Sequence, residues 1–262
     1  MYVGAADFMV VFAGALVGLI LGLIGGGGSI LAVPLLVYVV GVKSPHVAIG
    51  TSSVAVALSA FANLIDHARR DHVCWPVAIL FATSGVVGAA LGSTLGKYTE
   101  GQKLLVLFGM LMVAVAASMA LRRKGGDKRR VQLDRRNAPW VVGIGLVVGA
   151  LSGFFGIGGG FLVVPGLITA TSMAMIMAVG SSLVSVTAFG LTTAANYALS
   201  DLIDWRLVTL FVGGGIVGAL AGGRLATALA TQKRALSIVF AVVVATVGVY
   251  VVVRGMMMNL ME

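Results

Sequence analysis

Ten apolar segments, separated by short polar breaks, make up almost the whole chain, and they limit what it can fold into. They lie at about residues 7–24, 28–42, 45–65, 73–96, 102–121, 139–155, 160–172, 176–199, 205–229 and 235–254. Charged residues make up only 10% of the chain, compared with about 25% in soluble domains. A helix crosses a bilayer with about 20 apolar residues, so the sequence predicts an all-α polytopic membrane protein.

The two halves of the sequence repeat each other. Each half has a glycine run that ends in proline, "GLIGGGGSILAVP" at 22–34 and "GFFGIGGGFLVVP" at 153–165. The register continues through paired residues: Gly50 and Gly180, Asp71 and Asp201, Trp75 and Trp205, Gly85 and Gly215. Because each half holds five segments, we expect two inverted-topology repeats, with ten membrane crossings, or eight if the short segments re-enter rather than cross. The expected division is a first repeat at 1–121, a basic linker at 122–138 and a second repeat at 139–262.

The positions of Lys and Arg predict the orientation of these segments. If the linker "RRKGGDKRRVQLDRR" at 122–136 is cytoplasmic, so are Arg69, Arg70, Arg224, Lys233 and Arg234. The opposite side then receives only Lys43, Lys97, Lys103, Arg206 and Arg254. This asymmetry satisfies the positive-inside rule. We therefore expect a multi-pass protein of the inner (plasma) membrane, with the linker cytoplasmic and both termini outside.

Contiguous glycines interrupt the apolar pattern at two places, which we name the first glycine break (residues 25–28) and the second glycine break (residues 156–160). Each glycine costs a helix roughly 1 kcal/mol relative to alanine, so a run of them should end it. The helix that starts after such a break presents free N–H groups and a partial positive charge, which favour an anion. The candidate substrate-binding residues are Gly25, Gly26, Gly27, Gly28 and Ser29, and Gly156, Gly158, Gly159 and Gly160.

Close helix packing is the alternative explanation for glycine in a membrane helix. We assign that role to the glycines whose three- and four-residue spacing forms one helix face: Gly85, Gly88, Gly92, Gly215, Gly218 and Gly222. A contiguous run gives packing little benefit, so at the two breaks we favour an anion site.

Two hydroxyl clusters follow the breaks, "GTSS" at 50–53 and "GSS" at 180–182. Their candidate substrate-binding residues are Thr51, Ser52, Ser53, Ser181 and Ser182. These hydroxyls could bind the oxygens of an anion, or they could bond to their own helix or to a neighbour. In the inverted arrangement, each glycine break should lie beside the hydroxyl cluster of the other half.

The residue types absent from the apolar segments exclude several functions. No Arg, Lys, Asp or Glu lies in the middle of any segment, whereas a cation carrier usually has a buried carboxylate. Cys74 is the single cysteine, and neither an HExxH motif nor paired intramembrane carboxylates occur. We therefore expect no enzyme activity, no metal site and no cofactor. The net charge of +9 is assigned to orientation and lipid contact rather than to nucleic-acid binding.

At these motifs the chain resembles the TauE/SafE family of sulfite and organosulfonate exporters. The resemblance is carried by the two glycine runs, by "VAIGTSS" and "GSS", and by "DLIDWR", and it covers nearly the full chain. It implies an inner-membrane transporter for anions such as sulfite, sulfoacetate or sulfolactate. In the first half, "DHVCWP" departs from the pattern, because Cys74 and Pro76 stand where the second half has Asp204 and Arg206.

The residues and the resemblance together predict a secondary transporter that exports a small sulfur-containing oxyanion by alternating access. The anion would be held at helix N-termini, with a proton or another ion as the coupling partner. The alternatives are a passive anion channel and a carrier for another small anion such as a carboxylate. The expected partners are the anionic substrate and the lipid bilayer, with no nucleic acid.

Overall fold

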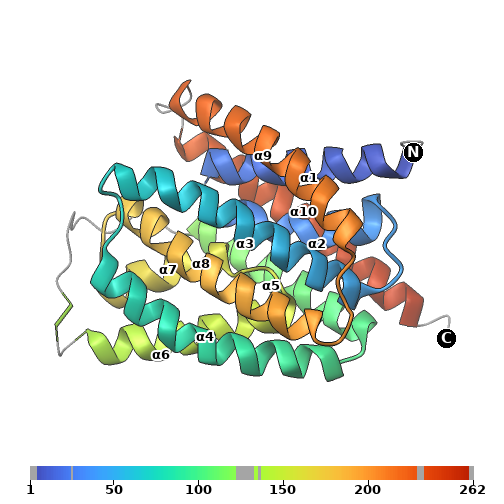
Figure 1. Cartoon of the computed structure of the whole chain (residues 1–262), viewed down its shortest axis with the longest axis horizontal. Helices are drawn as coiled ribbons and strands as arrows, with labels where there is room; N and C mark the ends of the chain where they lie inside the picture. Colours follow the sequence, from blue (N-terminus) through green and yellow to red (C-terminus); the bar gives the residue numbers. More distant parts are fainter. Residues whose placement is uncertain (1–4, 25, 122–132, 135–136, 229–232, 260–262) are drawn as a thin grey trace.

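The computed structural model describes residues 5–24, 26–121, 133–134, 137–228 and 233–259 (Figure 1). These residues form helices and no β-strand, as the sequence predicted. The first half contains α1 (Ala5–Ile24), the 3₁₀-helix η1 (Gly26–Leu31), α2 (Ala32–Pro34), the π-helix η2 (Leu35–Val39), α3 (Pro45–Arg69), α4 (Trp75–Tyr98) and α5 (Gly101–Leu121). The second half contains α6 (Ala138–Phe155), α7 (Gly160–Thr171), α8 (Met175–Ala198), α9 (Trp205–Ala228) and α10 (Lys233–Asn259).

All ten predicted apolar segments are helical in the structure. Among the described residues, α3, α4, α6, α8 and residues 205–222 of α9 are long and apolar enough to cross a membrane. The other five are shorter apolar helices, including both pieces that flank the first glycine break and α7, which follows the second. The second segment is the least regular, since it passes from 3₁₀ through one α-turn to π geometry. Most of the predicted linker lies outside the described residues.

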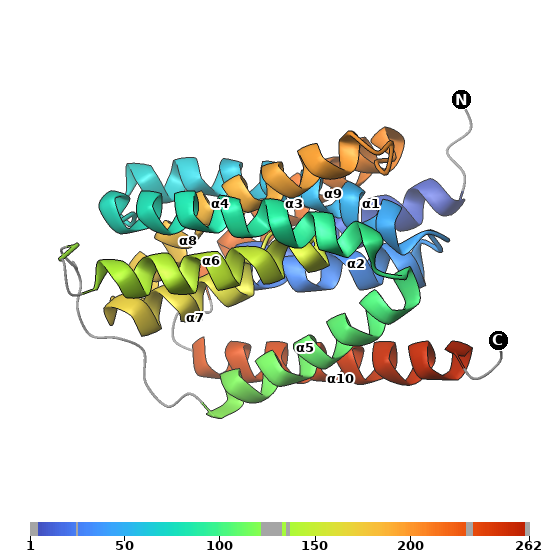
Figure 2. The same ribbon diagram turned by 90° about the horizontal axis from the view of Figure 1, so that it is seen from below.

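Helices of the two halves pair with each other rather than with their own neighbours in sequence. The most extensive contacts join α1 to α9, α4 to α6, α3 to α8 and α5 to α10. Figure 2 shows α5 and α10 as a pair along one side of the remaining helices. In both views α1 begins and α10 ends at one end of the molecule, while α5 ends and α6 begins at the opposite end.

Glycines allow the backbones of the α1–α9 and α4–α6 pairs to come close. A Cβ atom at Gly88 or Gly92 would collide with a carbonyl oxygen of α6, and one at Gly218 or Gly222 would collide with a carbonyl oxygen of α1. Lipid tails are as apolar as the side chains, so helices in a bilayer gain from such close contact rather than from hydrophobic burial. The packing role predicted for Gly88, Gly92, Gly218 and Gly222 is confirmed, whereas a Cβ atom at Gly215 would meet nothing closer than 3.7 Å.

Matching turns end α3 and α8. Asp71 and Asp201 have left-handed backbone, with φ of 55° and 54°. The following amides, at His72 and Leu202, donate to the carbonyls of His67 and Tyr197 at 3.0 and 3.1 Å. The sequence repeat is therefore matched by repeated local structure, and each turn delivers the chain to the start of the next long helix.

Candidate functional site

The second glycine break joins α6 to α7 through three residues with left-handed backbone. Gly156, Gly158 and Gly159 have φ of 66°, 63° and 72°, angles that side-chain-bearing residues adopt only at a cost. The whole break is buried, and Ile157 fills the interior between these glycines. Helix α7 begins directly after it, so the start of a helix lies inside the protein.

Neighbouring helices fill the space that side chains would take at the break. A Cβ atom at Gly156 would collide with the side chain of Ile49 on α3. At Gly158 it would lie 2.7 Å from Val56 Cγ1, also on α3. Both the backbone angles and the close approach of α3 therefore require glycine here.

The hydroxyl cluster of the first half contacts this break of the second half. Ser53 Oγ lies 2.9 Å from the carbonyl oxygen of Gly156 and 2.7 Å from that of Ile49. Ser52 Oγ lies 3.0 Å from the same Ile49 oxygen and 3.5 Å from that of Gly156. This confirms the expectation that a glycine break lies beside the hydroxyl cluster of the other half. In this conformation the two hydroxyls donate to backbone carbonyls, the alternative that the sequence left open.

The first glycine break is built differently. Gly26 and Gly27 begin the 3₁₀-helix η1, and Gly25 lies outside the described residues. Gly28 is buried, and a Cβ atom there would lie 2.5 Å from the backbone nitrogen of Leu21 on α1. Ser29 is fully buried. The 3₁₀-helix contacts α7 and α8, and α8 carries the "GSS" cluster.

Thr51 and Ser181, which correspond in the two halves, bind the starts of helices in the opposite half. The amide of Asp204 donates to Thr51 Oγ1 at 3.1 Å, and the amide of Cys74 donates to Ser181 Oγ at 2.8 Å. Ser182 instead donates to the Val179 carbonyl of its own helix at 2.8 Å. These bonds tie the start of α9 to the hydroxyl cluster of the first half and the start of α4 to that of the second.

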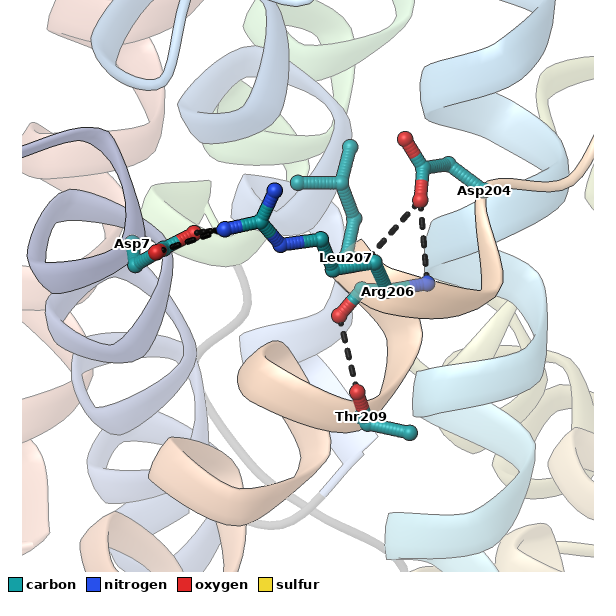
Figure 3. Close-up of polar contacts among 5 residues, drawn as sticks. All are labelled: Asp7, Asp204, Arg206, Leu207 and Thr209. Carbon is teal, nitrogen blue, oxygen red and sulfur yellow. Dashed lines mark hydrogen bonds and ion pairs between the residues drawn. The ribbon is translucent and has the colours of Figure 1, made fainter. Parts of the chain in front are cut away.

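The "DLIDWR" turn of the second half forms a helix cap and an ion pair (Figure 3). Asp204 Oδ1 accepts from the amides of Arg206 and Leu207 at 3.0 and 3.1 Å, at the start of α9. The Arg206 guanidinium lies 2.8 Å from the carboxylate of Asp7 at the start of α1. In the first half, Cys74 provides no side-chain cap, and Pro76 has no N–H to be capped.

Two buried hydroxyls were missed by the sequence analysis, and one of them lies beside the second glycine break. Ser152 on α6 and Ser185 on α8 are fully buried, and their Oγ atoms have no hydrogen-bond partner. A Cβ atom at Gly159 would lie 2.8 Å from Ser152 Oγ. The sequence did contain a signal for them. The two halves repeat each other, yet Ser152 and Ser185 stand where the first half has the apolar residues Leu21 and Ala55.

The polar groups around the breaks are neutral. Across the part of the chain that the structure describes, every buried polar side chain is a hydroxyl. The same residues contain no group of three His, Cys, Asp or Glu side chains that could hold a metal ion. Hydroxyls and the amides at the start of α7 can therefore supply neutral hydrogen-bond donors to an anion.

Comparison with known proteins covers almost the whole chain. The family model described as "Sulfite exporter TauE/SafE" matches residues 10–251. A probable membrane transporter protein of Xylella fastidiosa (strain Temecula1) is 50% identical over 244 residues, which cover 93% of this chain and 94% of the relative. The probable membrane transporter protein YunE of Bacillus subtilis (strain 168) is 26% identical over 271 residues, covering 94% of this chain and 97% of the relative. No solved structure matches the chain.

Proposed function

The chain belongs to the TauE/SafE family and is a membrane transporter rather than an enzyme, and from this premise we propose that it is a secondary transporter that exports a small sulfur-containing oxyanion such as sulfite or an organosulfonate. The second glycine break is the observation that carries the proposal. There, left-handed glycines bring the start of α7 into the protein interior, opposite Ser52 and Ser53 of the other half. Backbone amides at a helix start are favourable partners for an anion.

Neutral donors suit a carrier that must release its substrate. A fixed Lys or Arg in a low-dielectric interior would attract an anion strongly and slow its departure. Hydroxyls and amides, the donors at this site, give hydrogen bonds of moderate strength to a charged ligand. The candidate ligands remain Gly25 to Gly28, Ser29, Thr51 to Ser53, Gly156, Gly158 to Gly160, Ser181 and Ser182.

A carrier must expose its site to each side of the membrane in turn. In the proposed mechanism, two inverted repeats at 1–121 and 139–262 move relative to each other to do so. The contacts of Thr51 and Ser181 recur with the roles of the halves exchanged, which supports this arrangement. Alternating access would follow from moving one repeat against the other around an anion near the membrane midplane. A proton or another ion would be the coupling partner.

The proposed orientation in the inner membrane places the linker at 122–138 in the cytoplasm and both termini outside. A Lys128→Cys variant, made with Cys74 replaced by Ala, tests it. The new thiol should resist membrane-impermeant thiol reagents in intact cells and react after the cells are opened. Labelling of intact cells would reverse the proposed orientation.

Transport by purified protein in proteoliposomes tests the function. We expect saturable sulfite transport that concentrates the anion when a proton gradient is imposed. Gly159→Ala should abolish it, because a side chain would fill the space beside the start of α7. Gly143→Ala is the matched control, since Gly143 is exposed on α6 and a Cβ atom there meets nothing within 4 Å.

Each alternative function predicts a different result in the same assay. A passive channel would equilibrate sulfite without saturation and without concentrating it. A carrier for carboxylates would transport acetate or lactate in preference to sulfite. Normal transport by Gly159→Ala would show that the second glycine break is not the anion site.

A further inference from the structure

The hydroxyls of Ser152 and Ser185 are buried without a hydrogen-bond partner among the described residues. Both side chains are fully buried. Buried polar groups in native proteins are nearly always paired, because an unpaired one has lost its water without gaining a replacement. A ligand that binds in the course of function would provide the missing partner.

Ser152 faces the start of α7. Its Oγ would lie 2.8 Å from a Cβ atom at Gly159, so the absence of a side chain at Gly159 leaves this hydroxyl next to the helix start. The amides of Leu162 and Val163 donate to the Gly159 carbonyl, each at 2.8 Å. The two amides before them, at Gly160 and Phe161, belong to the first turn of the helix, where N–H groups have no partner within the helix.

The repeat places Ser185 near the same point. Ser152 and Ser185 correspond to Leu21 and Ala55, which line one small apolar cavity between α1, α3 and α9. That cavity is about the size of a single water molecule. Helix α4 contacts both α6 and α8, as α9 contacts both α1 and α3. By this correspondence Ser152 and Ser185 are expected to face a common point in the second half.

The corresponding surroundings differ between the halves. Ser59, which also lines the cavity of the first half, is replaced in the second half by Phe189. The Phe189 ring is fully buried and packs against Gly85 of α4. The second half therefore combines two hydroxyls with an apolar wall, while the first half has only apolar groups at the serine positions.

We propose that Ser152 and Ser185 bind the transported anion directly, together with the amides of Gly160 and Phe161, and that this subsite exists in the second half alone. The inference rests on the proposed function, since it takes the ligand to be a small oxyanion. Four neutral donors can reach several oxygens of one sulfonyl group. No buried cation is present among the described residues to offset a second charge, so the subsite should favour monoanions such as hydrogensulfite or methanesulfonate over sulfate.

Anion binding by the purified full-length protein tests the subsite. The probes are sulfite, methanesulfonate, acetate and sulfate, and the measurements are calorimetric affinity and the melting temperature with and without anion. Ser152→Ala and Ser185→Ala should each weaken methanesulfonate binding about tenfold or more, the effect of losing one hydrogen bond to a charged group. The melting temperature without anion should stay the same or rise, because the variants remove an unpaired buried hydroxyl.

Ser84→Ala is the matched control, since the Ser84 hydroxyl already donates to Phe81 of its own helix at 3.0 Å. It should leave anion affinity unchanged. Unchanged affinity in both serine variants would overturn the subsite and leave the proposed function standing. If a serine variant loses anion affinity and its melting temperature without anion also falls, the loss reflects damage to the fold, and the subsite is again overturned.

The remaining outcomes separate the subsite from the proposed substrate. If only acetate binds, and both serine variants weaken it, the subsite stands and the sulfur oxyanion is wrong. If sulfate binds more tightly than methanesulfonate, the preference for monoanions is wrong. If no probe stabilises the wild-type protein, both the subsite and the proposed substrate are overturned.

Discussion

The two glycine breaks are nearly identical in sequence and differ in structure. The second break uses three left-handed glycines to end α6 cleanly and begin the regular helix α7. The first break passes into a 3₁₀-helix and then into π geometry, and its glycine at position 28 packs against the backbone of α1. A glycine run thus permits a break without fixing its form, because glycine has no side chain to select one backbone conformation.

The surroundings decide the form that each break takes. At the second break, Ile157 stands where the first break has Gly26, and its buried side chain anchors the turn. Ser53 of the other half adds a hydrogen bond to Gly156. Because the breaks differ in this way, we propose that the second break, rather than the first, holds the anion. The predictions that follow test this proposal.

The largest effect is expected from a bulky residue at the second break. Gly159→Leu should reduce transport to background, since its backbone φ of 72° is strained for leucine and Ser152 occupies the space. Gly27→Leu in the first break should also abolish transport if an anion passes close to both breaks. Gly143→Leu should be neutral. Transport is measured in proteoliposomes, with the elution profile in detergent as the check on folding.

Normal transport by both break variants would make these glycines packing residues. Loss in Gly159→Leu with normal transport in Gly27→Leu would restrict the anion site to the second break. Loss in the control as well would show that the assay reports folding rather than binding.

The next largest effect concerns the hydroxyl clusters. Ser53→Ala should reduce the free energy of unfolding by about 1–3 kcal/mol, because the buried carbonyl of Gly156 loses the closer of its two hydroxyl donors. Ser182→Ala should cost less, since Ser182 donates within its own helix and the helix keeps its backbone bonds. Denaturant unfolding in detergent compares the two. Equal losses would contradict the difference between the clusters.

Helix capping should distinguish the two long helices α9 and α4. Asp204→Ala should cost about 1 kcal/mol, because two amides at the start of α9 lose their acceptor. Cys74→Ala should cost less than Asp204→Ala, because Cys74 provides no side-chain cap to α4. The unfolding midpoints of the two variants give the comparison. A larger loss in Cys74→Ala would show that packing, not capping, decides stability at these turns.

The ion pair between Asp7 and Arg206 should have the smallest effect. The Arg206 side chain is 63% exposed and the Asp7 side chain is 13% exposed. Removing the Asp7 charge leaves the guanidinium in contact with water, and pairs with an exposed partner contribute about 0–1 kcal/mol. Asp7→Asn should therefore shift the melting temperature slightly at low salt, and the shift should shrink at high salt. A large, salt-independent loss would indicate that Asp7 has a further role at the start of α1.

The sequence was sufficient to predict the helices and several of their packing faces. Segment bounds followed from the lengths of the apolar runs, because a membrane helix must satisfy its backbone internally. The packing faces followed from the spacing of Gly85, Gly88 and Gly92. The contact between Ser53 and the second glycine break followed from the odd number of segments per half. An odd number inverts the second half, and in the inverted arrangement each break enters from the same side as the hydroxyl cluster of the other half.

The sequence was not sufficient to predict the site in detail. Ser152 lies among small residues that resemble a packing face. The repeat sets it apart from Leu21, but its role depends on its three-dimensional position beside Gly159. Nor did the sequence predict that Thr51 and Ser181 accept from helix starts in the other half, because a hydroxyl near the start of a membrane helix has several possible partners. Such choices depend on where neighbouring backbone groups lie.

The most direct test of the central claim is a structure of the protein with selenite, a sulfite analogue whose selenium is located by anomalous scattering. We expect one selenium site at the start of α7, within hydrogen-bonding reach of Ser152 and the Gly160 amide through its oxygens. A selenium site at the first glycine break alone, or only beside surface Lys and Arg side chains, would contradict the account.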